Sequence, residues 1–402
     1  MKALQKSKRI HSMDSLRGIM MLLGLVIHSA ITYGVVDYGN SWSLKDGVST
    51  HLSNDFIVSF IHAFRMQAFF FVAGFFGAML FYERKPMKMI KNRVSRIVFP
   101  FIVFLILLWP TILFSFAYTE AVIAGSETAF SDTIAYFSDP RAFIPQRTFH
   151  LWFLYYLAMI TFVTVAIALV LNNFSRITSQ INRVFNAIFK HPLLRLLVFT
   201  SVTALGYVAM DTYSVATSTS FVPDIDTFIY YFIFYGIGWI FYSSKEHLDS
   251  FMRYDWLSVF VATLLFCVYF FMEDTLPYAS ILILKSVMVW LFIFGISGVF
   301  IRYWSNHSAV MRYLSDSSYW VYLVHLSFTA YLPSFIADWA IPATFKFLII
   351  LTTTGIICFV SYHFFVRGSF IGKFLNGRTY SKKLSDIRKA EAQSKLKPAI
   401  SR

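Results

Sequence analysis

The sequence predicts an all-α integral-membrane protein that crosses the bilayer about ten times. Of its 402 residues, 57% are hydrophobic and only 14% are charged, whereas an average soluble domain has roughly 45–50% and 25%. Aromatic residues make up 19% of the chain, including 46 Phe. This composition excludes a typical soluble enzyme, a disordered chain and a coiled coil, because most segments must bury both faces in lipid or in other helices.

Ten mostly apolar stretches approach the ~20 residues that a helix needs to cross ~30 Å of hydrocarbon. The first follows a basic segment, as a secretory signal does, but we expect it to be retained because no clear cleavage site follows. In chain order the expected spans are Arg17 to Val36, Phe56 to Phe81, Ile97 to Tyr118, Leu151 to Leu171, Leu193 to Met210, Thr227 to Tyr242, Trp256 to Met272, Ala279 to Tyr303, Ser317 to Phe335, and Ala343 to Phe365.

Basic residues collect in alternate loops between these spans. They occupy the N-terminus, residues 84–96, 176–195, 245–253 and 302–312, and the tail from Arg367; the exceptions are Lys45, Arg65, Arg141, Arg147, Lys285 and Lys346. Cytoplasmic loops of membrane proteins carry such an excess, so both termini are expected to be cytoplasmic. The net charge of +14 is therefore a topology signal, and no nucleic-acid partner is expected. Residues 1–376 are predicted to form one membrane domain, and residues 377–402 a basic, disordered cytoplasmic tail at the lipid surface.

Ionisable side chains at membrane depth are the most informative positions, because one at a helix centre costs ~2.5–3.5 kcal/mol. His28 lies eleven residues beyond Arg17, which is about 16 Å deeper and on nearly the same helix face. Arg65 and His325 fall at a similar depth on the second and ninth spans. Together they predict a polar chamber near mid-bilayer with a neutral imidazole as general base. The alternative is that interhelical hydrogen bonds among them only fix the packing.

Further polar residues accompany these three. His62 precedes Arg65 by three positions, which on a continuous helix puts both on one face. Ser318, Tyr322 and His325 follow an i, i+4, i+7 spacing and form one polar stripe on an apolar helix. We therefore include Tyr322 with the two histidines among the candidate catalytic residues, and His62 with Arg65 among the candidate substrate-binding residues.

Candidate binding residues also stand at the two membrane interfaces. His150 and Trp152 open the fourth span on the outer side, where an aromatic belt would place a tryptophan in any case. Arg93 and Arg96 are three positions apart at the inner end of the third span, level with Arg17. Guanidinium groups in this arrangement can bind phosphates bidentately, so a phosphorylated cytosolic donor is one interpretation; a topology signal with lipid-headgroup contacts is the other.

Several common catalytic motifs are absent from the sequence. It contains no GxxxxGK[ST] loop, no GxGxxG after a strand, no HExxH and no GxSxG, which argues against an ATPase, a dinucleotide enzyme, a zincin and a serine hydrolase. The two cysteines, Cys267 and Cys358, lie in apolar runs without metal-ligand spacing. No metal and no permanently bound cofactor are expected, and cofactor-free group transfer remains open.

Five stretches of the sequence resemble the acyltransferase-3 family of integral-membrane O-acyltransferases, and within it the glucan biosynthesis protein C branch. Arg17 with His28 is similar to the family's Arg-x10-His signature, and Arg93 with Arg96 to its RxxR. FIHAFRMQ points to the glucan branch. The stretches are MDSLRGIMMLLGLVIH (13–28), NDFIVSFIHAFRMQAFFFVAGFF (54–76), RVSRIVFPF (93–101), HLWFL (150–154) and YWVYLVH (319–325).

The resemblance implies a multi-pass protein of the bacterial inner membrane that acylates a carbohydrate hydroxyl. It implies that His28 is essential, that the inner arginines lie near cytosolic acyl-CoA, and that the branch transfers succinyl groups to osmoregulated periplasmic glucans. The sequence departs from the family where a Tyr-Glu pair is expected near the end of the last span, because it has Tyr362 and His363. Two alternatives stay open: O-acetylation of lipopolysaccharide or another surface polysaccharide, and secondary transport of an anionic solute.

Overall fold

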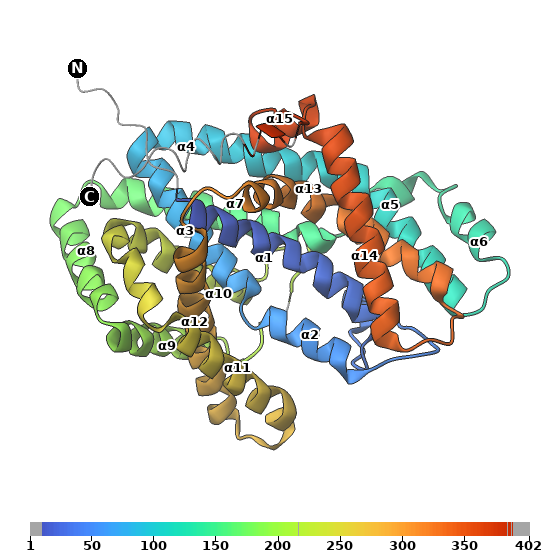
Figure 1. Cartoon of the computed structure of the whole chain (residues 1–402), viewed down its shortest axis with the longest axis horizontal. Helices are drawn as coiled ribbons and strands as arrows, with labels where there is room; N and C mark the ends of the chain where they lie inside the picture. The colour runs from blue at the N-terminus through green and yellow to red at the C-terminus, as the bar shows by residue number, and fades with distance from the viewer. Residues whose placement is uncertain (1–9, 216, 384, 387, 389–402) are drawn as a thin grey trace.

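The computed structural model describes residues 10–215, 217–383, 385, 386 and 388, and these form helices joined by turns and loops, without a strand (Figure 1). The all-α class predicted from the sequence is confirmed. The α-helices are α1 (His11–Ala30), α2 (Leu52–His62), α3 (Arg65–Arg84), α4 (Pro86–Arg93), α5 (Phe99–Ile123), α6 (Ala129–Tyr136), α7 (Trp152–Leu171), α8 (Ser175–Lys190), α9 (Pro192–Ala209), α10 (Ile225–Phe241), α11 (Asp255–Met272), α12 (Tyr278–Trp304), α13 (Ala309–Tyr331), α14 (Ala343–Ser361) and α15 (Phe370–Asn376).

All ten expected spans coincide with helices. Within the described residues, eight helical stretches are long and apolar enough to cross a membrane. One of them, Ile225–Thr275, contains both α10 and α11 and therefore covers two expected spans. The ninth expected span corresponds to α13, which is long enough but carries Arg312, Asp316 and several hydroxyl groups. These polar residues make α13 less apolar than the eight stretches, so it is not one of them.

Two local expectations were wrong. The second expected span is not one helix, because α2 ends at His62 and α3 begins at Arg65, with Phe64 in a non-helical conformation (φ −141°, ψ −24°). No glycine or proline marks this break; the Phe64 ring instead packs against Phe60 and Phe292. The basic segment 176–195, expected to be a loop, contains the amphipathic helix α8, whose only fully buried residue is Phe189.

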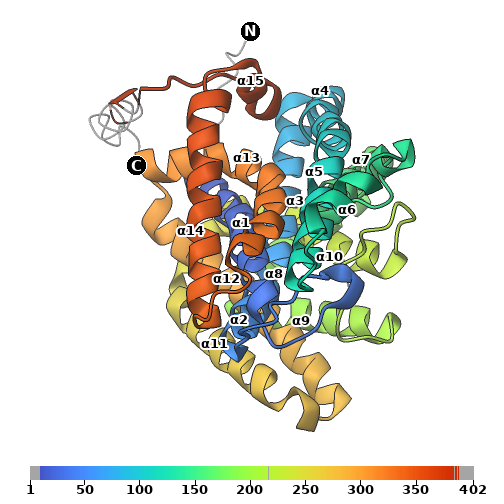
Figure 2. The same ribbon diagram turned by 90° about the vertical axis from the view of Figure 1, so that its right-hand side faces the viewer.

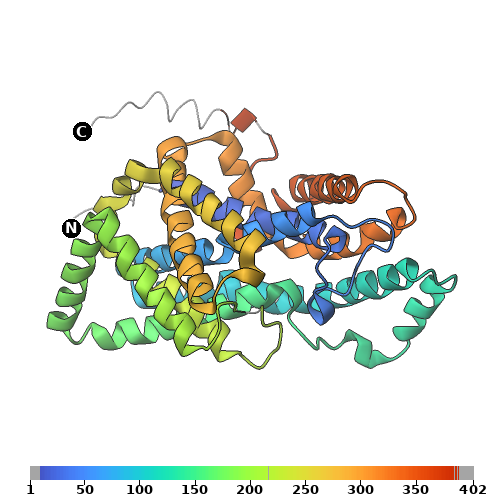
Figure 3. The same cartoon turned by 90° about the horizontal axis from the view of Figure 1, so that it is seen from below.

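α1 lies at the centre of the bundle and packs against α3, α12, α13 and α14. Seen along two perpendicular directions, α4 and α15 lie together at one end of the molecule, and the end of α11 lies at the other (Figures 1 and 2). The view from below separates α8 and α9 from α5 and α6, with α1 between the two groups (Figure 3). We call the end that contains α4 and α15 the basic end, because Arg84, Arg93 and Arg378 lie there.

Close contact between α3 and α10 depends on two glycines. A Cβ on Gly238 would overlap the main-chain oxygen of Phe71, and one on Gly74 would overlap that of Tyr235. Small residues of this kind let two membrane helices approach closely. The pair therefore fixes α3, which carries Arg65, against the rest of the bundle.

Replacing Gly238 by valine should destabilise the protein by about 3 kcal/mol, because the new side chain forces α10 away from α3. Thermal unfolding of the purified protein in detergent measures this as a lower midpoint. Gly236→Ala is the matched control, since nothing lies within 4 Å of a Cβ at that position on the same helix. Equal midpoints for the two variants would contradict the close helix contact.

Candidate active site

Three histidines from distant parts of the sequence meet inside the bundle. The His28 ring on α1 lies 5.3 Å from the His325 ring on α13, and the His325 ring lies 5.3 Å from that of His150. His325 and His150 are buried, whereas His28 is half-buried. The sequence predicted that His28 and His325 lie at the same depth, and the structure brings them into direct ring contact and adds His150.

The position of His150 follows from the turn that precedes α7. Phe149 has a positive φ of 46°, a conformation that is uncommon for a bulky residue and that surrounding contacts must hold. On one side, Thr148 donates from its main-chain nitrogen and its hydroxyl to the main-chain oxygen of Thr219. On the other side, the Tyr322 hydroxyl donates to the main-chain oxygen of His150 at 2.7 Å. Tyr322 thus holds the main chain of His150 against α13.

Hydrogen bonds to main-chain oxygens fix the tautomers of two of the rings. His325 donates from Nδ1 to the main-chain oxygens of Val321 and Tyr322, at 3.0 and 2.8 Å, and His150 donates from Nε2 to that of Leu323 at 2.9 Å. Because a carbonyl can only accept, the other nitrogen of each neutral ring carries a lone pair. Within the described residues, these nitrogens, His325 Nε2 and His150 Nδ1, have no partner, and neither has His28 Nδ1.

The Arg65 guanidinium lies next to this cluster. A Cβ built on Gly24 would come within 3.2 Å of Arg65 Nη2, and Gly24 stands one turn before His28 on the same face of α1. The phenols of Tyr231 and Tyr322 lie within electrostatic range of the guanidinium. The expected meeting of an imidazole from the first span with a guanidinium from the second is therefore present.

Arg65 differs from another buried arginine of the bundle, Arg195. Arg195 donates to the hydroxyl of Ser250 at 2.7 Å and stacks on the rings of Phe251 and Phe294. Arg65 is 9% exposed; among the described residues its guanidinium makes no hydrogen bond or ion pair, and its buried Nε has no partner. A buried charge normally has a partner, so Arg65 is suited to hold an anionic ligand.

A loop covers the end of the cluster opposite the basic end. The Trp42 ring stacks on the His28 ring at 5.2 Å, with its Nε1 donating to the Thr32 hydroxyl at 2.9 Å. The loop itself is anchored by a buried ion pair between Asp46 and Lys346 of α14, at 2.7 Å. His28 is therefore enclosed between Trp42 and His325.

A cavity of about 1080 Å³ leads from the basic end toward the cluster. Arg17, Arg93 and Arg96, which the sequence placed at one level, all line it. Its remaining walls approach the cluster along four helices. On each of these helices one lining residue lies within one to two turns of a site residue. These pairs are Met21 and His28, Phe69 and Arg65, Phe153 and His150, and Ser318 and Tyr322.

The arginines of this cavity are only partly satisfied by protein. Arg17 pairs with Asp14 at 3.3 Å. Arg93 immediately precedes a short π-helical segment, Val94–Val98, and Arg96 lies inside it. Such segments are frequent at functional sites. In the described part of the chain, Nε and Nη2 of Arg93 and Nη1 of Arg96 are buried without a hydrogen-bond partner. The cavity thus presents guanidinium donors to an anionic ligand.

Three sequence-selected residues do not join the ring contacts of this cluster. His62 is exposed at the end of α2 and does not share a continuous helix with Arg65, because the helix breaks between them; its ring nevertheless lies within electrostatic range of Arg65 and His28. Trp152 packs in the core beside Tyr231 and Tyr156, with ring distances of 5.5 and 6.0 Å. His363 lies at the basic end, with Nδ1 3.4 Å from the Tyr313 hydroxyl.

Sequence reasoning missed Trp42 and Tyr231. Trp42 lies in a loop whose fold onto α1 has no periodic signal, and Tyr231 is one of many aromatic residues in an apolar helix. Within the described residues, no group of three or more His, Cys, Asp and Glu side chains is arranged to hold a metal ion.

The fold and the site define an integral-membrane protein with an arginine-lined cavity that comes within one to two helical turns of a cluster of imidazoles, an arrangement suited to chemistry on an anionic substrate. The model of the acyltransferase domain family matches residues 10–363. The chain belongs to this acyltransferase-3 family and is a multi-pass membrane acyltransferase, so acyl transfer, rather than solute transport, is its class of reaction.

Curated relatives from Salmonella paratyphi B, Salmonella heidelberg and Salmonella enteritidis are named glucans biosynthesis protein C. Each is 30% identical over 162 residues, which are 40% of this chain and 39% of the relative. The matched region thus spans well under half of these relatives. No solved structure matches the chain.

Proposed function

We propose that this protein transfers a succinyl group from succinyl-CoA to hydroxyl groups of an osmoregulated periplasmic glucan, with His28 as general base. The observation that carries the proposal is the contact of His28 with His325 and its proximity to Arg65, two helical turns beyond a cavity lined by Arg17, Arg93 and Arg96. The glucan acceptor is supported by the name of the partly matching relatives. The succinyl donor is supported by the resemblance to their branch and by the chemistry of Arg65.

The dimensions of the cavity suit a CoA thioester. His28 stands eleven residues beyond Arg17 on α1, a rise of about 16 Å, and an extended pantetheine arm spans roughly 15 to 20 Å. Phosphates held at the arginines would therefore place the thioester near His28. We propose that the basic end faces the cytoplasm of a bacterial cell and that the protein lies in the inner membrane, so that donor and acceptor approach from opposite sides.

In the proposed reaction, the glucan hydroxyl oxygen attacks the thioester carbonyl as His28 removes the hydroxyl proton. The tetrahedral intermediate then expels the CoA sulfur, and the proton returns from the imidazolium to the leaving thiolate. The products are a succinyl ester and free CoA, with no net change in protons. His325 and His150 surround the base with neutral rings, and Tyr322 holds His150 in place.

Arg65 supplies the proposed selectivity for succinyl. Succinyl differs from acetyl by a terminal carboxylate, and a guanidinium binds a carboxylate through two parallel hydrogen bonds. The absence of a protein partner for Arg65 among the described residues supports this role, because the ligand then completes the charge pair.

Mass spectrometry of periplasmic glucans tests the proposal directly. Glucans from cells that contain the protein should be heavier by one or more succinyl groups than glucans from cells that lack it, because no other product of the reaction stays on the sugar. A His28→Ala variant expressed at the same level should give the unmodified mass. An acetyl increment, or a change confined to lipopolysaccharide, would contradict the proposed donor or acceptor.

A further inference from the structure

A short segment that follows α15 crosses the basic end and contributes to the wall of the cavity. We call residues 377–381 the C-terminal strap. Gly377 ends α15 in the left-handed conformation, with φ 77°, and both Gly377 and Arg378 line the cavity together with Arg96. A Cβ on Gly377 would overlap the Arg96 guanidinium, so the strap lies directly against one of the proposed donor-binding arginines.

Hydrogen bonds to main-chain oxygens hold the strap and the end of α15 on the ends of two membrane helices. Tyr380 donates its main-chain N–H to the main-chain oxygen of Arg367 at 2.9 Å. Arg367 in turn donates from Nε to the main-chain oxygen of Ser381 at 2.8 Å, and Asn376 donates to that of Asp316 at 3.0 Å. Because Arg367 is almost fully buried, these bonds attach the strap firmly to the bundle.

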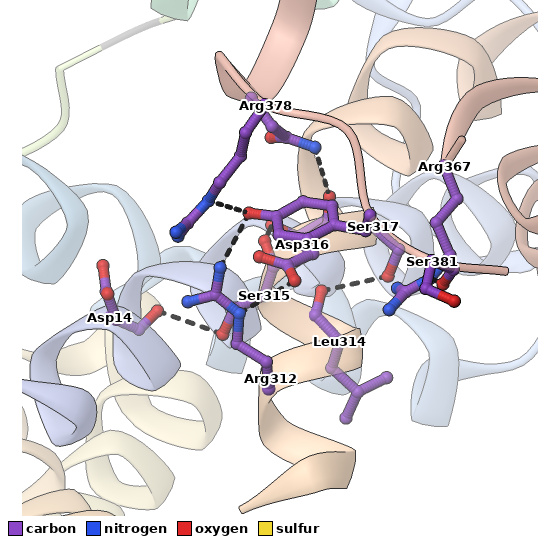
Figure 4. Close-up of polar contacts among 12 residues, drawn as sticks. Asp14, Arg312, Leu314, Ser315, Asp316, Ser317, Arg367, Arg378 and Ser381 are labelled. Atoms are coloured by element: carbon purple, nitrogen blue, oxygen red, sulfur yellow. Dashed lines mark hydrogen bonds and ion pairs between the residues drawn. The ribbon is translucent and has the colours of Figure 1, made fainter. Parts of the chain in front are cut away.

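The Tyr380 hydroxyl is the centre of a charged network formed by Arg312, Asp316 and Arg378, which are labelled in Figure 4. It accepts hydrogen bonds from Arg312 Nη2 at 2.7 Å and from Arg378 Nε at 2.9 Å. Burial, and to a smaller extent the negative charge of Asp316, raise the pKa of Tyr380 to about 12. The phenol therefore keeps its proton at neutral pH and donates a hydrogen bond to the Asp316 carboxylate. The network thereby fixes the Arg378 side chain through its Nε.

The cavity has more positive than negative charge available for a ligand. Its two carboxylates are already engaged: Asp14 pairs with Arg17, and Glu83 accepts a hydrogen bond from Tyr242 and lies 3.7 Å from Lys245. Within the described part of the chain, the hydrogen bond from Nε to Tyr380 is the only one that Arg378 makes. Its two Nη groups stay available beside Arg96, and like charges in such proximity favour an anion between them.

We propose that Arg378 binds a phosphate group of the acyl-CoA donor and that the C-terminal strap positions it for this contact. The inference rests on the proposed function, since it assumes a CoA thioester in the cavity. It adds a donor-binding arginine that comes from a segment after the last membrane helix. Tyr380 is a positioning residue, because it orients the Arg378 guanidinium without reaching the ligand.

Isothermal titration of unacylated CoA into the purified full chain in detergent tests this assignment. Arg378→Ala should raise the Kd for CoA about tenfold to a hundredfold, because it removes a charge-assisted hydrogen bond to phosphate. Arg378→Lys should recover part of this loss, since a lysine keeps the charge but not the fork of two donors. Tyr380→Phe should weaken binding by a smaller factor. Lys373→Ala is the matched control, because this exposed lysine of α15 does not line the cavity.

The outcomes separate this inference from the proposed function. If wild-type protein binds CoA and Arg378→Ala binds it equally well, the role of Arg378 is refuted while the donor site stands. The role is also refuted if Arg378→Ala and Lys373→Ala lose the same affinity. If wild-type protein does not bind CoA, the proposed donor fails, and the inference with it. Thermal unfolding of each variant without ligand shows whether a loss of binding reflects a loss of folded protein.

Discussion

Replacing His28 by alanine should lower the rate of succinyl transfer by about 10²–10⁴-fold, the usual contribution of a positioned general base. A sugar hydroxyl is a weak nucleophile, and without the imidazole its proton has no acceptor as the new bond forms. The affinity for CoA should change little, because the arginines of the cavity are at least three helical turns away. Glucan-dependent release of CoA from succinyl-CoA by the purified protein measures the rate.

His191→Ala is the control for this experiment. His191 is exposed between α8 and α9 and its side chain makes no capping hydrogen bond, so its replacement should leave the rate unchanged. A His28→Ala protein that binds CoA normally and still transfers succinyl at a rate near that of the wild type would refute the assignment of the base. A second variant, His325→Ala, should also be slow, because His325 forms one wall around His28.

Replacing Arg65 by leucine should abolish the preference for succinyl over acetyl donors. Removing one member of a buried charge pair costs 2–5 kcal/mol, so succinyl transfer should fall by about 30-fold or more. Acetyl transfer should fall far less, because acetyl has no carboxylate for the guanidinium to bind. The ratio of kcat/KM for succinyl-CoA to that for acetyl-CoA is the quantity to measure, since it cancels differences in the amount of folded protein.

Arg195→Leu is the matched control for this ratio. It also removes a buried guanidinium from a membrane helix, but that guanidinium is bonded to Ser250 and stacked on two phenylalanine rings. It should lower stability and leave the donor preference unchanged. Arg65→Lys should give an intermediate preference. An equal loss of both activities in Arg65→Leu, or no loss, would contradict the proposed carboxylate contact.

The sequence was sufficient to predict the helical architecture and much of the site. Membrane spans are recognisable because hydrocarbon requires about twenty apolar residues in a row. Against that background, His28, Arg65 and His325 stand out as costly exceptions. Their similar depth predicted that they meet, and in the structure they do. The shared cavity of Arg17, Arg93 and Arg96 was predicted in the same way, from charges at one level.

Features that depend on tertiary contacts were not predictable in this way. The break between α2 and α3 has no glycine or proline to announce it, and follows from the packing of Phe64 on Phe292. Trp42 reaches His28 only because its loop folds back across α1. Gly377 and Arg378 belong to a segment predicted to be a disordered tail, but residues up to Lys382 make hydrogen bonds to the bundle. Residues 384, 387 and 389–402 lie outside the described part of the chain.

The ion pair between Asp46 and Lys346 has a consequence for how the proposed glucan acceptor would approach His28. Lys346 is fully buried and also donates to the main-chain oxygen of Ala337, and separating such a pair costs about 3–5 kcal/mol. A raised loop would then be populated at roughly one percent or less. The loop that carries Trp42 is therefore expected to stay in place during the reaction. A long sugar chain would have to reach His28 by passing beside the loop, and not through an opening of it.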